Sequence, residues 1–363
     1  MNTLGHSIHI TLFGASHAAS VGCVLEGMPA GCPVDTESIA ADLALRRPAP
    51  GIGTARHEPD VPVIEGLEDG YTAGKPIRFT FANTDVRSED YVRDGRVPRP
   101  GHADYPAWCR YGDAYDFRGG GMFSGRMTAP LVAVGGMLRP ILADMGIQVG
   151  SYMRRIGSVA DEGVYTPEEI FRQSRTNPLR AMHSDIEEKM RAEILAAKAE
   201  GDSVGGAVRC VASGLPVGLG EPFFDSLDGE LARAVFAVPG IKAVSFGEGF
   251  AASSMRGSAN NDGYRYGADG SVELTSNHAG GVLGGLADGA PLVMDAAFKP
   301  TPSISRQQTS INLDTHQNAD LSVVGRHDPC IAPRGAIVLE AVTMFILTDL
   351  LIRGGFAFNA DHR

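Results

Sequence analysis

The sequence predicts one domain of mixed α and β structure. Hydrophobic residues make up 43% of the 363 positions and charged residues 21%, which is the balance of a globular protein and not of a disordered chain. Stretches with a two-residue apolar period and stretches with a helical period occur in the same chain. No repeat, low-complexity tract or linker divides residues 1–363, so we expect a single domain.

Alternating apolar residues predict the strands. Residues 7–13 place Ile8, Ile10 and Leu12 on one face, as in a strand with one buried side. The same kind of pattern predicts further strands at residues 21–25, Ile77–Ala82, Gly206–Ser213 and residues 291–298.

Helical composition predicts a helix at Thr36–Leu45, with Asp35 placed to cap its first turn. Residues 128–145 also have a helical pattern. Pro130 is tolerated in the first turn of that helix, whereas Pro140 is expected to kink or break it.

Residues 185–200 carry the clearest helical signal. Ser184 and Glu187 have the spacing of a capping box. Helix-spaced ion pairs are expected between Glu187 and Arg191 and between Lys189 and Glu193. The apolar stripe that would face the core consists of Ile186, Met190, Ile194 and Ala197.

The most hydrophobic stretch, residues 336–352, is predicted to be a core helix that ends at Gly354 and Gly355. It is short for a membrane span and contains Glu340 and Asp349. The first twenty residues show no basic segment followed by an apolar one, so no signal peptide is expected.

Charge and cysteine usage narrow the partners and the compartment. A net charge of −11 argues against nonspecific binding to nucleic acid or to an anionic membrane. The odd number of widely spaced cysteines indicates reduced, mostly buried thiols in a cytoplasmic protein. These cysteines are Cys23, Cys32, Cys109, Cys210 and Cys330.

Three blocks place a histidine in a turn. Phe13-Gly14-Ala15-Ser16-His17 is a strand running into a small-residue turn, and histidine suits acid–base work near neutral pH. Pro100-Gly101 turns the chain so that Arg99 and His102 lie close, with Asp104 able to orient one of them. Arg326-His327-Asp328 offers a cation, a ring and a carboxylate. Each block also fits a hydrogen-bonded turn without catalytic function.

Two glycine-rich blocks could approach an anion closely. Arg118 and three glycines precede Ser124, Arg126 and the helix from Thr128, which resembles an anion cradle. Paired glycines at 280–281 and 284–285 are followed by the lysine and hydroxyl groups of residues 299–303. The alternative interpretations are a flexible turn for the triple glycine and a tight corner for the paired glycines.

Two other site chemistries are weakly supported. Gly247-x-Gly249-x-x-Ala252 matches a dinucleotide fingerprint superficially, but residues 253–267 lack the pattern of the required helix. A metal-dependent hydrolase would need ligands from His17, His102, Asp104, His327 and Asp328, whose spacing matches no metal motif. We therefore expect no metal.

Seven sequence blocks together resemble the chorismate synthase family, in the same order and over nearly the whole chain. They read FGASHAASVGCVLEGMPAG, RRPAPGIGTARHEPD, RPGHADYPAWCRYG, DFRGGGMFSGR, SNHAGGVLGGLADG, KPTPS and GRHDPC.

This resemblance implies an α+β fold, a β-α-β sandwich with helices between antiparallel sheets, assembled as a homotetramer. It implies a lyase of aromatic amino acid biosynthesis that converts 5-enolpyruvylshikimate 3-phosphate to chorismate by 1,4-anti elimination of phosphate. The cofactor would be reduced FMN. NADPH would act only indirectly, through an external flavin reductase.

The resemblance also implies roles for individual residues. His17 would protonate the departing phosphate, His102 would protonate the reduced flavin near N1, and Asp328 would sit near N5 and assist proton removal. The substrate carries two carboxylates and a phosphate, so a cationic cleft is needed locally, with Arg46, Arg99, Arg126 and Arg326 as candidates. Flavin contacts would come from Ser124, Pro239, Gly240, Gly284, Lys299, Pro300, Thr301, Pro302, Ser303 and Arg326.

The chain departs from the usual family pattern at several places. Ala15 and Ala18 stand where a Glu and a Gly are common, and Met122-Phe123 precede Ser124 where an arginine is often found. The loop at residues 47–56 is one residue shorter than in many relatives, and Arg56 could replace a missing arginine. These changes motivate an alternative, a paralogue that binds flavin but no longer turns over.

Overall fold

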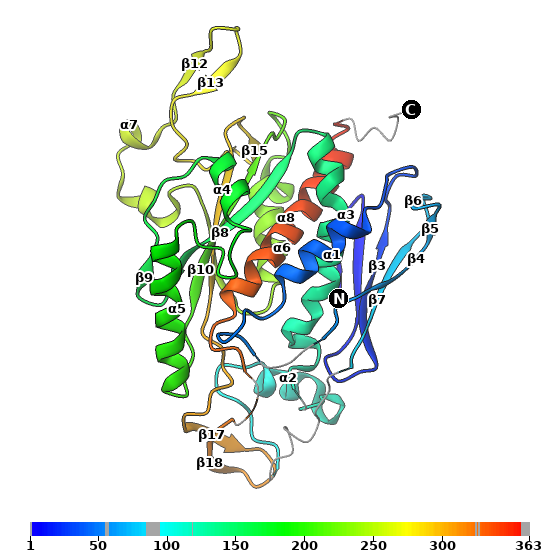
Figure 1. The fold of residues 1–363 in the computed structure, drawn as a ribbon, viewed down its shortest axis with the longest axis vertical. Coiled ribbons are helices and arrows are strands. Elements are labelled where there is room, and N and C mark those ends of the chain that lie inside the picture. Colours follow the sequence, from blue (N-terminus) through cyan, green and yellow to red (C-terminus); the bar gives the residue numbers. More distant parts are fainter. Residues whose placement is uncertain are drawn as a thin grey trace.

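Two antiparallel five-stranded sheets enclose a layer of helices (Figure 1). The computed structural model describes residues 2–54, 58–84, 95–117, 119–323, 325 and 327–356. The helices α1, α3, α6 and α8 lie between the blue sheet that contains β3 and β7 and the green sheet that contains β8 and β10. This is the predicted β-α-β sandwich.

The first sheet has the order β1-β2-β3-β7-β4. Its inward side chains, such as Ile10, Cys23 and Phe79, are buried, so the alternation of the sequence does separate two faces. The strands are β1 (Thr3–Leu4), β2 (His9–Gly14), β3 (Ser20–Glu26), β4 (Val63–Glu65) and β7 (Ile77–Ala82).

The second sheet has the order β11-β16-β10-β8-β9 and is covered on both faces. In β8, Ser151 faces Glu340 of α8, whereas a Cβ at Gly150 would meet the ring of Phe171 in α4. Its strands are β8 (Gln148–Ile156), β9 (Val159–Ala160), β10 (Gly206–Ser213), β11 (Ile241–Phe246) and β16 (Leu292–Phe298).

The middle layer consists of α1 (Thr36–Leu45), α3 (Thr128–Asp144), α6 (Leu227–Phe236) and α8 (Ala332–Arg353). As predicted, Asp35 caps α1, accepting from the backbone N–H groups of Glu37 and Ser38 at 2.8 and 3.1 Å. Helix α8 is long and apolar enough to cross a membrane, but 94% of its most apolar window is buried inside the protein, as in a core helix.

The two acidic residues of α8 are paired inside the core. Glu340 binds Arg180, Arg139 (2.6 Å) and the Ser151 hydroxyl (2.8 Å). Asp349 accepts from three successive backbone N–H groups of the segment before β2, at 2.6 to 2.9 Å. Both buried carboxylates therefore have hydrogen-bond or ion-pair partners. These partners come from distant segments and are not apparent in the sequence of α8 itself.

Pro140 was expected to kink or break its helix, and the expected break is wrong. Helix α3 continues through Pro140 to Asp144. Proline removes the N–H that would bond to the carbonyl four residues earlier, that of Gly136. In the structure the hydroxyl of Ser38 in α1 donates to this carbonyl at 2.8 Å, so no buried acceptor is left without a partner.

Helices α4 (Pro167–Gln173) and α5 (Ser184–Ala199) cover the second sheet. The predicted capping box of α5 does not form, because Ser184 is already helical and His183 occupies the cap. Glu187 pairs with Arg191 as predicted, at 2.8 Å. Lys189 pairs with Asp185 instead of Glu193, whose carboxylate accepts from Ser158.

Smaller elements surround this framework. Residues 253–267 do not form the long helix that a dinucleotide fingerprint would need, in agreement with the sequence analysis. Four of the five cysteines are buried and Cys109 is exposed, and all are free. The remaining helices are α2 (Asp104–Tyr111) and α7 (Gly257–Asn260), and the hairpins pair β5 (Leu67–Glu68) with β6 (Tyr71–Thr72), β12 (Tyr264–Tyr266) with β13 (Val272–Leu274), β14 (Val282–Leu283) with β15 (Leu286–Ala287), and β17 (Gln308–Asn312) with β18 (Gln317–Leu321).

Candidate active site

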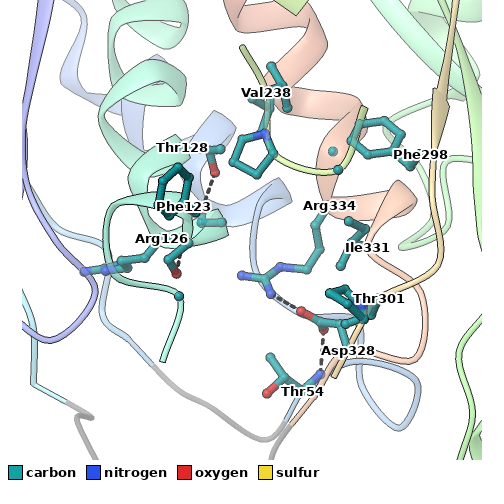
Figure 2. Close-up of a pocket in the computed structure, with 18 of the residues that line it drawn as sticks. Thr54, Phe123, Arg126, Thr128, Val238, Phe298, Thr301, Asp328, Ile331 and Arg334 are labelled. Carbon is teal, nitrogen blue, oxygen red and sulfur yellow. Dashed lines mark hydrogen bonds and ion pairs between the residues drawn. The ribbon is translucent and has the colours of Figure 1, made fainter. Parts of the chain in front are cut away.

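A cavity of about 560 Å³ lies where the first turns of α3 and α8 approach the end of α6 (Figure 2). Loops distant in sequence complete its wall: the end of α1, residues 99–103, and the segment that follows β16. Its size is that of a pocket for a cofactor or small substrate.

The described lining contains more positive than negative side chains. Six are cationic, and three are carboxylates. A locally cationic cavity therefore exists in a chain whose net charge is −11. The cations are Arg46, Arg47, Arg99, Arg126, Lys299 and Arg334, and the carboxylates are Glu58, Asp60 and Asp328.

Asp60 joins two of the predicted substrate-binding arginines. Arg46 contacts one carboxylate oxygen at 2.6 Å and Arg126 contacts the other. Burial favours the neutral acid, but Arg46 and Arg126 outweigh it and hold the pKa of Asp60 below its ordinary value. Burial lowers the pKa of Arg46 to about 10.

These two arginines differ in the donors that they leave for a ligand. Arg126 also donates to Asn83 and to the Ala82 carbonyl, and Figure 2 shows it pointing away from Asp328 and Arg334. Arg46 retains a buried Nε for which no partner is found among the described residues. Arg46 is thus the better placed of the two to meet an anion.

The Pro-Gly turn brings Arg99 and His102 together as predicted. The His102 N–H donates to the Arg99 carbonyl at 3.2 Å, and Gly101 adopts a left-handed φ of 73°. Asp104 orients both side chains: Arg99 Nε and His102 Nδ1 donate to its carboxylate at 2.7 and 2.6 Å. Burial favours neutral Asp104, but these hydrogen bonds hold its pKa well below the usual range.

Asp328 lines the same cavity and is held by two donors. Arg334, in the first turn of α8, contacts it at 2.5 Å, and the backbone N–H of Thr54 donates to it at 2.8 Å (Figure 2). Arg334 also donates to the Arg46 carbonyl at 2.9 Å, which links α8 to the end of α1.

His17 lies outside the cavity lining and is separated from it by Gly119. It is not part of the lining, but its ring lies against Gly119, whose neighbour Gly120 does line the cavity. The Gly119 carbonyl accepts from Arg99 Nη2 at 2.6 Å. The Ser16 hydroxyl lies 3.2 Å from His17 Nδ1. The structure thus brings His17 to the back of the Arg99–His102 turn.

Most of the predicted flavin contacts do line the cavity. Gly240, with a left-handed φ of 92°, turns the chain from α6 into β11 and its carbonyl accepts from the Lys299 N–H at 2.9 Å. Thr301 presents a buried hydroxyl without a partner among the described residues. The predicted flavin contacts in the lining are Ser124, Pro239, Gly240, Lys299, Thr301, Pro302 and Ser303.

Two of the predicted contacts that the structure describes are not part of the lining. Gly284 lies in the turn between β14 and β15, and Pro300 is absent from the wall although its neighbours belong to it. Arg326 lies outside the described residues, as do Arg56 and Arg118. Gly280 and Gly281 pack closely against backbone at Gly247 and Leu292, which is the structural alternative for these glycines.

The triple glycine does not lead directly into α3. Two 3₁₀ turns come before the helix: Gly121–Phe123, which contains the third glycine, and Gly125–Met127, which Ser124 caps by accepting from the Arg126 N–H. Gly120 and Gly125 form part of the cavity wall.

Several lining residues were not predicted from the sequence. Asp60 is the last residue of the block RRPAPGIGTARHEPD. The signal that could have identified it as a partner of arginine is that this block contains three arginines. Arg334 follows Asp328 by six residues, too far for a local pattern. The apolar wall was not predicted as a unit; it includes Phe123, Val238, Phe298, Ile331 and Val338.

Metal-ligating groups do not gather in the cavity among the residues that the structure describes. The described group close enough to share an ion is His6, Asp225 and Glu230, which is not part of the cavity lining. Among the described residues, the candidates for a metal-dependent hydrolase do not form a group that could share one ion.

Known proteins resemble this chain over most of its length. The model of the chorismate synthase family matches residues 8–352. Chorismate synthases of Pyrococcus abyssi and Dehalococcoides mccartyi are 44% and 42% identical to it, covering 96% and 98% of this chain and 97% of each relative. A crystal structure of a chorismate synthase aligns with a TM-score of 0.76 at 25% identity, covering 96% of this chain and 93% of that one.

The structural match confirms the predicted fold class, and the sequence matches confirm the resemblance noted from the seven blocks. Because both extend over nearly the whole chain and the cavity combines several of those blocks, the chain belongs to the chorismate synthase family of carbon–oxygen lyases.

Proposed function

We propose that this protein converts 5-enolpyruvylshikimate 3-phosphate to chorismate, the last common step towards the aromatic amino acids. Family membership supports the proposal, and the cationic cavity carries it. A substrate with two carboxylates and a phosphate needs fixed positive charge, which Arg46, Arg99 and Lys299 offer from three different loops. In the reaction a carbon–oxygen bond to phosphate breaks, a proton leaves carbon and a double bond forms.

The residues present fit reduced FMN as cofactor. An isoalloxazine ring would find the apolar wall that includes Phe123, Val238 and Ile331. The unpartnered Thr301 hydroxyl is a polar group that a ligand would satisfy. When bound, reduced flavin would lend electron density to the departure of phosphate.

Three groups would handle protons. His102 has Nδ1 engaged by Asp104, which leaves Nε2 to hold a proton towards the cavity. Asp328, which is paired with Arg334, would assist removal of the substrate proton. His17 would protonate the leaving phosphate, reaching the site from behind Gly119.

The test of these roles is turnover in His17→Ala, His102→Ala and Asp328→Ala. Each should lose about 10²–10⁴-fold in rate because a positioned acid or base is removed. His183→Ala, at an exposed helix cap, is the matched control and should keep its rate. Near wild-type rates in all three variants would refute the assignment.

The flavin-binding paralogue without turnover remains the second candidate, motivated by Met122 and Phe123. Both side chains line the cavity, and Met122 is 55% exposed. This candidate predicts tight FMN binding with no phosphate release. Restoration of activity by changes at Met122 and Phe123 would favour it.

The proposal also covers the domain organisation, oligomeric state and location of the protein and the source of its reduced flavin. It includes one domain over residues 1–363, a homotetramer, a cytoplasmic location, and flavin reduced by an external reductase that uses NADPH. Exposed aromatic side chains support self-association, since Phe224, Phe250 and Tyr266 are 95%, 88% and 80% exposed. Light scattering of the purified protein tests the tetramer.

A further inference from the structure

The Asp104 carboxylate is wholly buried and accepts five hydrogen bonds. Its Oδ1 accepts from Arg99 Nη2 (2.8 Å), His102 Nδ1 (2.6 Å) and the Tyr115 hydroxyl (2.9 Å). Its Oδ2 accepts from Arg99 Nε (2.7 Å) and from the Arg99 backbone N–H (3.0 Å). Asp104 itself is 0% exposed and is not part of the cavity wall. It can act on a ligand only through the side chains that it holds.

The contacts around Oδ1 decide where the His102 ring carries its proton. Arg99 Nη2 lies 3.1 Å from His102 Nδ1, but a guanidinium has no acceptor and Nδ1 already faces a carboxylate oxygen. The two nitrogens are close because both donate to the same oxygen. An unprotonated Nδ1 would set its lone pair against Oδ1, so the neutral ring must carry its proton on Nδ1.

Nε2 of the ring lies 3.4 Å from Arg99 Nη2, a donor, and no carboxylate is recorded against it among the described residues, so Nε2 is the exchangeable position. His102 is part of the cavity wall and its side chain is 13% exposed. Charged groups around it include Arg99 and Asp104, which contact the ring, and Lys299, whose ammonium donates to the carbonyl of the preceding residue, Gly101. Asp328 and Arg334 line the same cavity and are bound to each other.

We propose that Asp104 is a positioning residue that fixes His102 as the Nδ1–H tautomer and locks the Arg99 guanidinium beside it, so that Nε2 alone exchanges a proton with a bound ligand. The catalytic meaning of this arrangement rests on the proposed function. The tautomer itself is a property of this chain.

Asp104→Asn makes the two oxygen positions of the side chain chemically different, because one becomes an amide oxygen that accepts and the other an NH₂ group that donates. An amide NH₂ at the Oδ2 position would face two N–H donors of Arg99, neither of which can accept. The Oδ1 side presents one Arg99 donor, Nη2, but there the Tyr115 hydroxyl and His102 Nδ1 can both accept. The NH₂ group should therefore turn to the Oδ1 side. His102 would then carry its proton on Nε2, the wrong tautomer, as in the Asp-to-Asn change of a catalytic triad.

The experiment is ¹⁵N NMR of the whole protein labelled with ¹⁵N-histidine, at a pH where the ring is neutral. His102 is one of ten histidines and is assigned by the signals that vanish in His102→Gln. We expect protonated Nδ1 and unprotonated Nε2 in the wild type, and the reverse in Asp104→Asn. Tyr115→Phe and Asp113→Asn, the latter an exposed neighbour, should keep the wild-type pattern.

A wild-type ring protonated on Nε2, or an Asp104→Asn ring that keeps the wild-type tautomer, overturns the inference. If Asp104→Asn does not fold, the wild-type spectrum alone decides. Steady-state kinetics supply a second arm: Asp104→Asn should lower kcat about 10²-fold or more with a smaller change in KM. A reversed tautomer with unchanged kcat would refute the positioning role. Absence of chorismate from the wild type would instead refute the proposed function.

Discussion

The ring of His17 lies directly against Gly119: a Cβ at Gly119 would stand 2.1 Å from His17 Cε1. Gly119 has a left-handed φ of 58°, and its carbonyl accepts from Arg99. One glycine therefore separates two predicted functional side chains, and the absence of its side chain lets His17 approach.

Gly119→Ala should displace His17 while the fold survives. The new methyl meets the end of a side chain that can swing away, so the position of the ring changes, not the backbone around it. We expect turnover to fall at least 10-fold, measured as phosphate release. Gly112→Ala is the control, since Gly112 has a φ of 55° but open space around its Cβ. Gly112→Ala thus also places a side chain at a positive φ, and equal losses of turnover in both variants would contradict a specific effect on His17.

Asp60→Asn should destabilise the protein strongly. It leaves Arg46 and Arg126 buried without their shared counter-ion, which costs about 3–5 kcal/mol when one partner of a buried pair is removed. Urea unfolding measures the change. Glu68→Gln, in an exposed pair with Lys75, should change stability by no more than about 1 kcal/mol. A similar small effect of Asp60→Asn would show that the arginines do not depend on it.

Glu340 should make the fold acid-sensitive. Burial raises its pKa, but Arg180, Arg139 and Arg175 outweigh burial and lower the pKa below the ordinary 4.5. The unfolded chain then binds the proton more readily, so this contribution to stability is present above pH 4.5 and is lost as the pH falls towards the folded pKa.

The measurement is the free energy of unfolding from pH 7 to pH 3 for Glu340→Gln beside the exposed control Glu188→Gln. Glu340→Gln should be less stable at pH 7 but should lose less stability on acidification than the control does. Parallel curves for the two variants would show that the pKa of Glu340 is not lowered by folding.

Ser38 and Pro140 should be energetically coupled. Ser38→Ala removes the donor to the Gly136 carbonyl and should cost about 1–3 kcal/mol, because proline provides no N–H in its place. In the double variant Ser38→Ala, Pro140→Ala, the restored N–H of residue 140 should recover part of this loss. A double-mutant cycle by urea unfolding measures the coupling, and strict additivity would contradict it.

Elements with local signals were predictable from the sequence. Thr36–Leu45 and its cap Asp35, the strand Gly206–Ser213 and the core helix α8 all follow from periodicity and composition within one segment. The Pro100-Gly101 turn likewise places Arg99 beside His102 through residues that are adjacent in the chain.

Features that depend on distant partners were not predictable. Pro140 is tolerated because Ser38, 98 residues away from Gly136, supplies the missing donor to its carbonyl. The capping box at Ser184 failed because the chain enters α5 one residue earlier than the pattern indicates.

The candidate site follows the same division between local and distant partners. Its histidines and arginines were found as motifs, whereas the Asp60 and Arg334 contacts that hold them join segments that only folding brings together. No pattern within a single segment shows such a pairing.

The most direct test of the central claim is an anaerobic assay of the unaltered protein with 5-enolpyruvylshikimate 3-phosphate and chemically reduced FMN, following chorismate and phosphate together. The account predicts that both products appear at equal rates and in equal amounts. Neither product, from folded protein with FMN bound, would contradict it and favour the paralogue that binds flavin without turnover.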